Sequence, residues 1–192
     1  MMLDKTAKIS KGKIKMNIKD LNEKLNEVIF TGKVIMIDGP WGSGKTFEVK
    51  QFIEKGKGNK YYVSLFGVES FKELTESLYC LLHPAKSRKS GIENVSISLL
   101  GNGVSFGVDF SNDKEIEKIK NGKGKTIILD DIERADFSKL HMKNILGYSE
   151  RLSLQGFAVL LIINSKELKS EDRAALDEFY EKVVDNKFVI DI

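Results

Sequence analysis

A run of eight residues, Gly39 to Thr46, has the residue types and the spacing that hold phosphate groups in proteins. It reads GPWGSGKT and matches the pattern G-x-x-x-x-G-K-[ST] in full. Glycines in such a loop permit backbone conformations that other residues avoid, so successive N–H groups point at phosphate oxygens. Lys45 is then expected to bridge the β- and γ-phosphates, while the Thr46 hydroxyl coordinates Mg²⁺. The sequence therefore predicts a site for a nucleoside triphosphate with Mg²⁺.

The segments on either side of this loop fit the same interpretation. A short apolar strand, Lys33 to Asp38, precedes the loop, and a helix, Thr46 to Glu54, follows it. The positive end of the helix dipole would then face the phosphates. Trp41 could shield the loop or approach a base, but we favour a side chain that caps the sheet edge. We expect the nucleotide to contact the whole loop: Gly39, Pro40, Trp41, Gly42, Ser43, Gly44, Lys45 and Thr46.

Adjacent carboxylates end a second apolar run. The segment Thr126 to Asp130 reads TIILD, and Asp131 follows it. An unpaired ionised Asp in a sheet interior is costly, so two of them at a strand end need a cation or strong donors. We expect Asp130 to hold Mg²⁺ together with Thr46, and Asp131 to orient or deprotonate the water that attacks the γ-phosphate. An exposed acidic loop is the alternative, and it would be preferred if the phosphate loop were absent.

A third apolar run, Phe157 to Ile163, ends at Asn164, whose amide could hydrogen-bond both the γ-phosphate and the attacking water. A helix N-cap or a turn explains an Asn at this position equally well. Arg134 could contact a phosphate in a neighbouring subunit, but an ion pair with Glu133 or Asp136 is the simpler expectation.

These residues fall at the ends of short apolar strands that alternate with amphipathic helices. We expect strands at 33–38, 61–65, 126–130, 157–163 and 187–191, and helices at 18–30, 46–54, 70–82, 137–155 and 171–183. This alternation predicts an α/β fold with a mostly parallel five-stranded sheet, because parallel neighbours need a crossover helix. Ligands in such sheets bind at the carboxyl ends of the strands, where the loop and the polar residues above are placed.

Two stretches depart from the alternation. Residues 1–18 are rich in lysine and poor in large apolar residues, so we favour a solvated basic arm over one added edge strand. From Val95 to Phe110, apolar residues alternate with others around a glycine-rich turn, a pattern typical of a β-hairpin. The predicted organisation is a basic arm at 1–18 and one core at 19–192, which carries an inserted hairpin region at 83–112.

Composition restricts the class of protein. The chain has 192 residues, of which 41% are hydrophobic, enough for one sizeable core. Its formal net charge of +3 is too small to indicate a dedicated nucleic-acid or anionic-membrane binder. The single cysteine, Cys80, cannot form an internal disulfide, which fits a reducing compartment. Because the N-terminus lacks an apolar signal segment and no stretch approaches the roughly 18 apolar residues of a membrane helix, we expect a cytoplasmic protein with no membrane span.

Four segments together resemble the KAP P-loop NTPases, relatives of the AAA-type and STAND ATPases. They read GPWGSGKT, YYVSLFGVESFKELTESLY, IILDDIERAD and VLLIINSKEL. The resemblance implies a three-layer P-loop fold that binds ATP and Mg²⁺, with five strands in the order 5-1-4-3-2, counted along the chain. By position, it implies phosphate binding by residues 39–46, Mg²⁺ coordination by Thr46 and Asp130, a catalytic or sensing role for Asp131 and a sensor role for Asn164.

The resemblance covers roughly residues 30–190 and also implies partners. Members of this family are associated with membrane signalling complexes and with bacterial phage exclusion. They are generally longer, with a helical lid after the core and often membrane helices between the two motifs, where this sequence has only the 83–112 region. We therefore expect either a fragment of a larger protein or a minimal version that works through a protein partner or as a homo-oligomer.

Two functions from different classes fit these patterns. One is an ATP-dependent switch in which hydrolysis needs Asp131 and the Asn164 loop couples the nucleotide state to a partner. The other is an interaction module that does not hydrolyse nucleotide and docks on a larger NTPase, with the predicted hairpin as an edge strand. A small-molecule kinase would need several arginines to clamp two polyphosphates, and a GTPase would need an Asn-Lys-x-Asp motif that residues 164–167 lack. We rank both of these lower.

Overall fold

A parallel sheet with helices on both faces forms the centre of the molecule. The computed structural model describes residues 12–29, 32–55, 58–83 and 122–190. Its strands are β1 (Gly12–Met16), β2 (Val34–Asp38), β3 (Asn59–Ser64), β4 (Lys125–Asp130), β5 (Ala158–Ile163) and β6 (Asn186–Ile190). Its α-helices are α1 (Leu21–Val28), α2 (Lys45–Lys55), α3 (Phe71–Leu82), α5 (Met142–Leu154) and α6 (Ser170–Val183). Three short 3₁₀ helices are η1 (Ile18–Asp20), η3 (Ile132–Arg134) and η4 (Ser165–Glu167).

The strand order is β1-β6-β2-β5-β4-β3, and every neighbouring pair is parallel. The prediction of an α/β fold with a parallel sheet is confirmed, but the sheet has six strands, so the predicted five-strand order is corrected. The five expected strands follow one another as β6-β2-β5-β4-β3, and β1 is added outside β6. The phosphate-loop strand, β2, therefore lies inside the sheet between β6 and β5.

The added strand comes from the stretch for which we favoured a solvated arm. In β1, Ile14 and Met16 alternate with lysines and pack against the core cluster on the α1 side of the sheet. Ile14 is in register with Phe188, and Met16 with Ile190. An edge strand needs only one apolar row, and the lysines that suggested a solvated tail occupy its other face. For residues 12–16 the alternative, an edge strand, is therefore the correct one.

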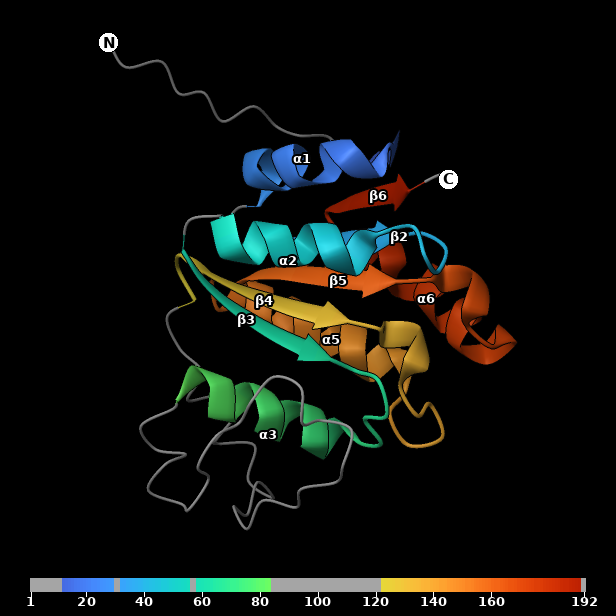
Figure 1. Ribbon diagram of the computed structural model, residues 1–192. Coiled ribbons are helices and arrows are strands. Elements are labelled where there is room, and N and C mark those ends of the chain that lie inside the picture. The colour runs from blue at the N-terminus through green and yellow to red at the C-terminus, as the bar shows by residue number, and fades with distance from the viewer. Residues whose placement is uncertain (1–11, 30–31, 56–57, 84–121, 191–192) are drawn as a thin grey trace.

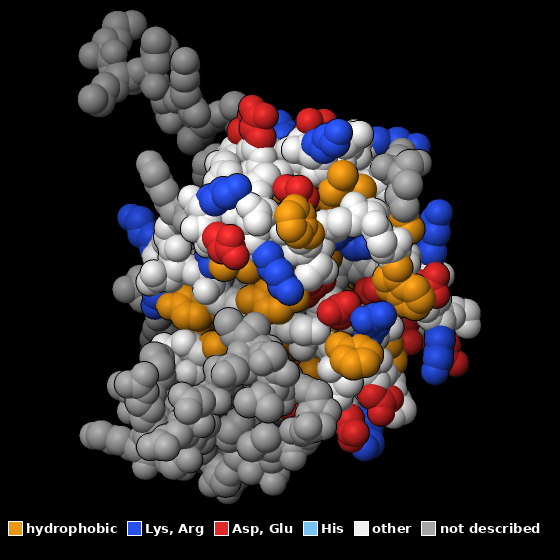
Figure 2. Space-filling model, in the orientation of Figure 1, with side chains coloured by type: hydrophobic (Ala, Val, Ile, Leu, Met, Phe, Trp, Pro, Cys, Tyr) orange, Lys and Arg blue, Asp and Glu red, His pale blue; other side chains and the backbone are white. Residues whose placement is uncertain are grey.

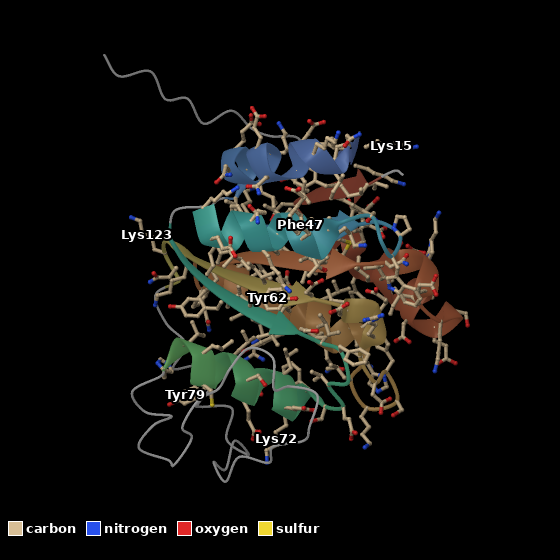
Figure 3. The ribbon with its side chains drawn as sticks, in the orientation of Figure 1. Lys15, Phe47, Tyr62, Lys72, Tyr79 and Lys123 are labelled. Carbon is tan, nitrogen blue, oxygen red and sulfur yellow. The ribbon has the colours of Figure 1, made fainter. Side chains whose placement is uncertain are left out.

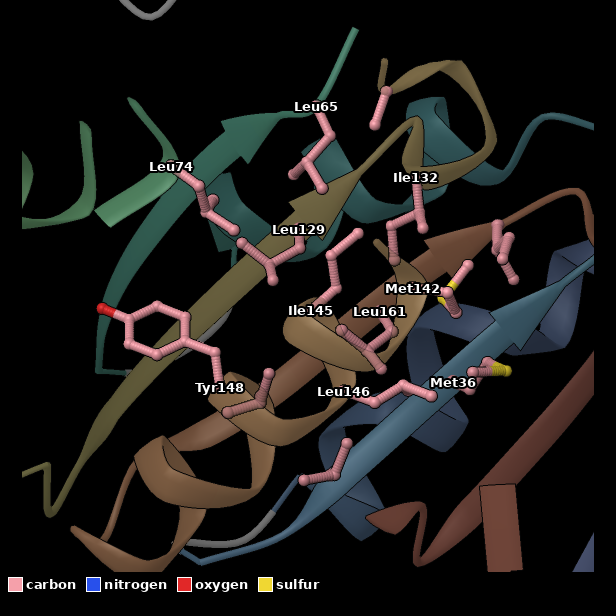
Figure 4. Close-up of a cluster of buried hydrophobic side chains, with 14 of the residues drawn as sticks. Met36, Leu65, Leu74, Leu129, Ile132, Met142, Ile145, Leu146, Tyr148 and Leu161 are labelled. Carbon is pink, nitrogen blue, oxygen red and sulfur yellow. The ribbon is translucent and has the colours of Figure 1, made fainter. Parts of the chain in front are cut away.

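Alternate residues of the buried strands face two helical layers, as in a three-layer fold. Figure 1 shows α2 on the near side of the sheet and α5 on the far side. Ile35 and Ile37 of β2 join the cluster under α1 and α2, while Val34 and Met36 join the cluster under α3, α5 and α6. Figure 4 shows part of the second cluster, where Tyr148 of α5 lies beside the β4 strand. With both faces covered, the continuous apolar strands are fully buried, and their carboxyl ends emerge together at one edge.

Two helices are shorter than their patterns predicted, and one predicted element cannot be compared. The expected helix at 18–30 consists of η1 followed by α1, which ends at Val28. The expected helix at 137–155 begins at Met142, because Asp136 donates its N–H to Val68 O at 3.0 Å and accepts from Ser138 N at 3.0 Å, which forms a turn. The expected hairpin at 95–110 lies outside the described residues. Within the described ranges, the search for an apolar helix of membrane-spanning length finds none.

Candidate functional site

A cavity of about 340 Å³ lies at the carboxyl ends of β4 and β5, beside the first turn of α2. It brings together the loop and the acidic strand end, which are more than 80 residues apart in the chain. The cavity is lined by Trp41, Gly42, Gly44, Lys45, Thr46, Phe47, Asp130, Asp131, Glu133, Arg134, Ile162 and Ile163. Figure 3 labels Phe47 on α2, which lines the cavity, and Tyr62 on β3, whose hydroxyl donates to Asp130. Of the predicted site residues, Gly39, Pro40, Ser43 and Asn164 are not part of the wall.

The glycines of the loop have two different structural roles. Gly42 and Gly44 have φ values of +76° and +85°, which residues with a side chain rarely adopt. Gly39 has no positive φ; a Cβ there would lie 3.0 Å from Ile190 Cβ, so close packing against β6 requires glycine. Its N–H donates to Ile163 O at 3.1 Å, which ties the start of the loop to β5. The expectation that all three glycines supply unusual backbone angles is thus correct for two of them.

The Lys45 side chain is buried within the loop rather than extended into solvent. Its Nζ donates to Gly39 O at 2.7 Å and to Pro40 O at 2.9 Å. Burial lowers the pKa of Lys45, while the negative charges of Glu133, Asp130, Asp38 and Asp131 act in the opposite direction. The N–H groups in the first turn of α2 have no acceptor within the helix. Together with the Lys45 ammonium group, they can bind an anion.

Asp130 ends β4 almost completely buried, with 2% of its surface exposed. Its Oδ2 accepts from the Tyr62 hydroxyl at 2.7 Å, and its Oδ1 accepts from Asp131 N at 2.8 Å. Burial raises the pKa of Asp130, and contacts that include the Thr46 side chain lower it in part. Thr46 and Asp130 therefore lie close enough to share one cation.

The donor set at this position fits Mg²⁺. Thr46 and Asp130 offer only oxygen atoms, the ligands that this hard cation prefers. Within the described ranges, no group of three or more His, Cys, Asp or Glu side chains is arranged to hold a metal by itself. A cation here would thus share protein oxygens with the oxygens of a phosphate, which is the usual arrangement for Mg²⁺.

Asp131 has the left-handed backbone conformation, with φ 55° and ψ 38°. Its Oδ2 accepts from Ser64 Oγ at 2.9 Å, and its Oδ1 lies 3.7 Å from Arg134 Nη1. These contacts hold the carboxylate at the wall of the cavity. Asp131 therefore follows Asp130 at the same strand end, but different partners orient the two carboxylates.

Glu133 is the functional candidate that the sequence analysis missed. Its Oε1 accepts from Trp41 Nε1 at 2.5 Å, and its Oε2 accepts from Asn164 N at 3.0 Å. Trp41, predicted to cap the sheet edge, instead has 52% of its surface exposed and reaches toward Glu133. Since these partners are 92 and 31 residues away along the chain, spacing could not indicate the contact. The only available signal was a third acid two residues after Asp131.

Asn164 follows β5 with 3% of its surface exposed. Within the described part of the chain, its Oδ1 is buried and has no hydrogen-bond partner. Asn164 precedes η4, but its side chain makes no capping hydrogen bond. Asn164 therefore occupies the N-cap position without using its side chain to cap the helix, and its amide oxygen is available for another partner.

Arg134 contacts none of the partners that its sequence neighbours suggested. Among the described residues, its ion pair is with Asp131, at 3.7 Å, rather than with Glu133 or Asp136. Its guanidinium carbon lies 5.3 Å from the ring centre of Trp41 and 5.2 Å from that of Phe66. A cation between two exposed aromatic rings is stabilised by both of them.

Behind the loop, Asp38 connects β2 to the segment that carries Asn164. Its carboxylate accepts from Ser165 N at 2.9 Å and from Ser165 Oγ at 2.6 Å, and it pairs with Lys187 Nζ at 2.7 Å. Arg173 of α6 in turn donates to Ser165 O. These bonds fix the position of the β5 end relative to the phosphate loop.

Comparison with known proteins agrees with this geometry. A family model described as "KAP family P-loop domain" matches residues 15–111, a span that contains the phosphate loop and ends before Asp130. No curated protein matches the chain.

Proposed function

The chain belongs to the KAP family of P-loop domains, and from that premise we propose that it binds ATP with Mg²⁺, hydrolyses the terminal phosphate and uses the reaction as a conformational switch. The family places a nucleotide-binding core in the chain; ATP as the nucleotide, Mg²⁺ and hydrolysis are the proposal. The observation that carries it is the position of Lys45, buried in a loop with two positive-φ glycines and lining the same cavity as the carboxylates that end β4.

Phosphate binding depends on the loop and on Lys45. The ammonium group donates to two loop carbonyls, and a phosphate oxygen is a stronger, charged acceptor for the same N–H groups. The first turn of α2 adds unpaired N–H groups and the positive end of the helix dipole. A polyphosphate would therefore be held by backbone and side chain together.

The acidic end of β4 supplies the cation site. Thr46 and Asp130 would hold Mg²⁺, which when bound neutralises phosphate charge and polarises phosphate oxygens. The Tyr62 hydroxyl and the Asp131 N–H orient the Asp130 carboxylate, so it is positioned before any cation arrives. Such second contacts around a metal ligand fix its geometry.

Two further groups would take part in hydrolysis. Asp131 lies at the cavity wall and would accept a proton from the attacking water. Asn164 directly follows Ile163 of that wall, and its buried Oδ1, which has no hydrogen-bond partner among the described residues, would hydrogen-bond the same water. The Ser64 and Arg134 contacts restrict Asp131 to one orientation. A well-oriented base raises the rate because less freedom is lost on reaching the transition state.

The same contacts of Asp131 favour a second candidate function. A carboxylate already held by a hydroxyl and a guanidinium is less free to contact an attacking water, as expected of a module that binds nucleotide without hydrolysing it. The two functions differ in phosphate release, not in nucleotide binding.

Thermal unfolding and phosphate release, measured on the same sample, distinguish these functions. With Mg-ATP at about 100 times its dissociation constant, we expect a stabilisation of about 2.7 kcal/mol, lost with EDTA, together with phosphate release. Mg-GTP serves as the matched nucleotide control. Stabilisation without phosphate release would leave the binding module as the function, and no stabilisation by any nucleotide would contradict the proposal.

A further inference from the structure

Glu133 joins three separate parts of the site through one carboxylate. It lies on η3, just after β4; one oxygen accepts from the Trp41 indole of the phosphate loop, and the other accepts from Asn164 N at the end of β5. We call these three residues the Glu133 bridge. Both of its hydrogen bonds are donated to an ionised carboxylate, which makes them stronger than neutral ones.

The bridge lies close enough to Lys45 for a bound phosphate to repel the Glu133 carboxylate. Glu133 lines the cavity, and among the carboxylates that raise the pKa of Lys45 its charge has the largest effect. A terminal phosphate held by Lys45 brings several negative charges toward the same carboxylate. In a partly buried site such like charges repel strongly, because little water screens them.

We propose that Glu133 is a positioning residue that senses the terminal phosphate: a γ-phosphate at Lys45 displaces its carboxylate, which frees Asn164 N–H to donate to that phosphate and releases the Trp41 indole. The inference rests on the proposed function, since it requires a nucleotide in the loop. A diphosphate, which lacks the γ-phosphate, leaves the bridge in place. The bridge thereby distinguishes the two nucleotide states.

Release of the Trp41 indole would change the molecular surface around it. Trp41 and Phe66 have 52% and 55% of their surfaces exposed, and the Arg134 guanidinium lies between their rings. Figure 2 shows exposed hydrophobic side chains with charged side chains among them on this side of the molecule. A shift of Trp41 removes one of the two rings that hold Arg134, so this surface changes when the terminal phosphate is present.

The chain carries its own probe for this change. Trp41 is its only tryptophan, so intrinsic tryptophan emission reports the surroundings of this one residue, and the comparison of Mg-ADP with Mg-ATP isolates the effect of the terminal phosphate. We would record emission of the full chain without nucleotide, with Mg-ADP and with Mg-ATP, for the wild type, Glu133→Gln and Glu167→Gln. Glutamine has one carbonyl oxygen and no charge, so it cannot accept both bonds or be repelled by phosphate. Glu167, exposed on η4, is the matched control.

In the wild type and in Glu167→Gln, we expect Mg-ATP to shift the emission and Mg-ADP to leave it nearly unchanged. In Glu133→Gln, the emission should be shifted without nucleotide and should no longer distinguish ATP from ADP. Its preference for ATP over ADP in binding should rise by roughly fivefold or more, because the repulsion is removed. Glu133→Asp, too short to span both donors but still charged, should show the shifted emission and no such rise.

The inference is overturned if Mg-ATP stabilises the wild type against unfolding but ATP and ADP give the same emission. A Glu133→Gln protein whose emission responds to ATP as the wild type does would overturn it equally. In both cases the proposed function stands. If Mg-ATP neither stabilises the wild type nor releases phosphate, the proposed function fails, and the inference fails with it.

Discussion

Two carboxylates end strands at the same edge of the sheet, with β5 between them, and their partners differ in kind. Asp38 on β2 and Asp130 on β4 have 8% and 2% of their surfaces exposed. Asp38 pairs with a cation, Lys187, at 2.7 Å and accepts two bonds from Ser165. Asp130 accepts from a tyrosine hydroxyl and a backbone N–H, and its neighbour Asp131 is another acid.

This difference appears in the protonation of the two groups. Burial acts to raise the pKa of Asp38, but the hydrogen bonds and charge of Lys187 and the bonds from Ser165 bring it below its ordinary value. Burial raises the pKa of Asp130, and its donors do not compensate. The charge of Asp38 is thus balanced inside the chain, while that of Asp130 costs stability until a cation arrives. Buried charge with an internal partner indicates structure; buried charge facing a cavity without one indicates a ligand site.

The largest expected effect concerns the acidic end of β4. Asp131→Asn should lower phosphate release by roughly 10²- to 10⁴-fold, the usual contribution of a general base. Asparagine tolerates the left-handed backbone at this position, so folding and ATP binding should persist. A steady-state phosphate assay checks the rate, and thermal unfolding with Mg-ATP checks binding. Equal rates in variant and wild type would show that Asp131 is not the base.

On the structural side of the comparison, Asp38→Ala should destabilise the protein by about 3 kcal/mol, because the mostly covered Lys187 side chain, 15% exposed, loses its carboxylate partner. Denaturant unfolding measures the change. Asp177→Ala, at an exposed position on α6, is the matched control and should differ from the wild type by less than about 0.5 kcal/mol. A loss below 1 kcal/mol in Asp38→Ala would remove the distinction between the two carboxylates.

At the ligand site, Asp130→Asn should change the free energy of unfolding in the opposite direction to Asp38→Ala. Removing a buried charge that forms no ion pair within the described residues should stabilise the protein by about 0.5–2 kcal/mol, the usual gain when a functional site is neutralised. The same variant should lose the dependence of ATP binding on Mg²⁺. Unfolding curves at pH 7 without nucleotide give the first result. A destabilised Asp130→Asn protein would mean that this carboxylate is structural too.

The smallest effect is a pH dependence. Because the folded-state pKa of Asp38 lies below the ordinary value of 3.8, its contribution to stability is complete above that value and disappears as the pH falls through the folded pKa. Stability measured from pH 5 to pH 2 should therefore fall less steeply in Asp38→Asn than in the wild type. Parallel curves for the two proteins would contradict the assignment of the lowered pKa to this group.

Local patterns predicted most of the fold and indicated the continuous segments that line the candidate site. The phosphate loop, the strands and the paired acids occupy short continuous segments, and hydrophobic periodicity or residue spacing indicates each of them. The edge strand β1 was misjudged because its lysines and its apolar row, Ile14 and Met16, have equal weight in the sequence. Only pairing with β6 decides between an arm and a strand.

Unlike the local patterns, the contacts of Glu133 and Asp38 join residues that lie far apart in the sequence. Glu133 reaches Trp41 and Asn164, and Asp38 reaches Ser165 across 127 residues. Such contacts arise because parallel strands bring their carboxyl ends to one edge, so the partners depend on strand order. Nothing in the spacing of these residues encodes that order. Knowledge of the strand order would bring these partners to one edge of the sheet. It would not identify which donor each carboxylate binds.

Calorimetric titration of Mg-ATP into the wild-type chain, Lys45→Ala and Lys50→Ala tests the central claim most directly, since Lys50 is an exposed lysine on the same helix. Binding should weaken by roughly 10- to 100-fold in Lys45→Ala, as expected for the loss of charged hydrogen bonds, and should be unchanged in Lys50→Ala. Equal affinities of the wild type and Lys45→Ala for Mg-ATP would contradict the assignment of the nucleotide site to this loop.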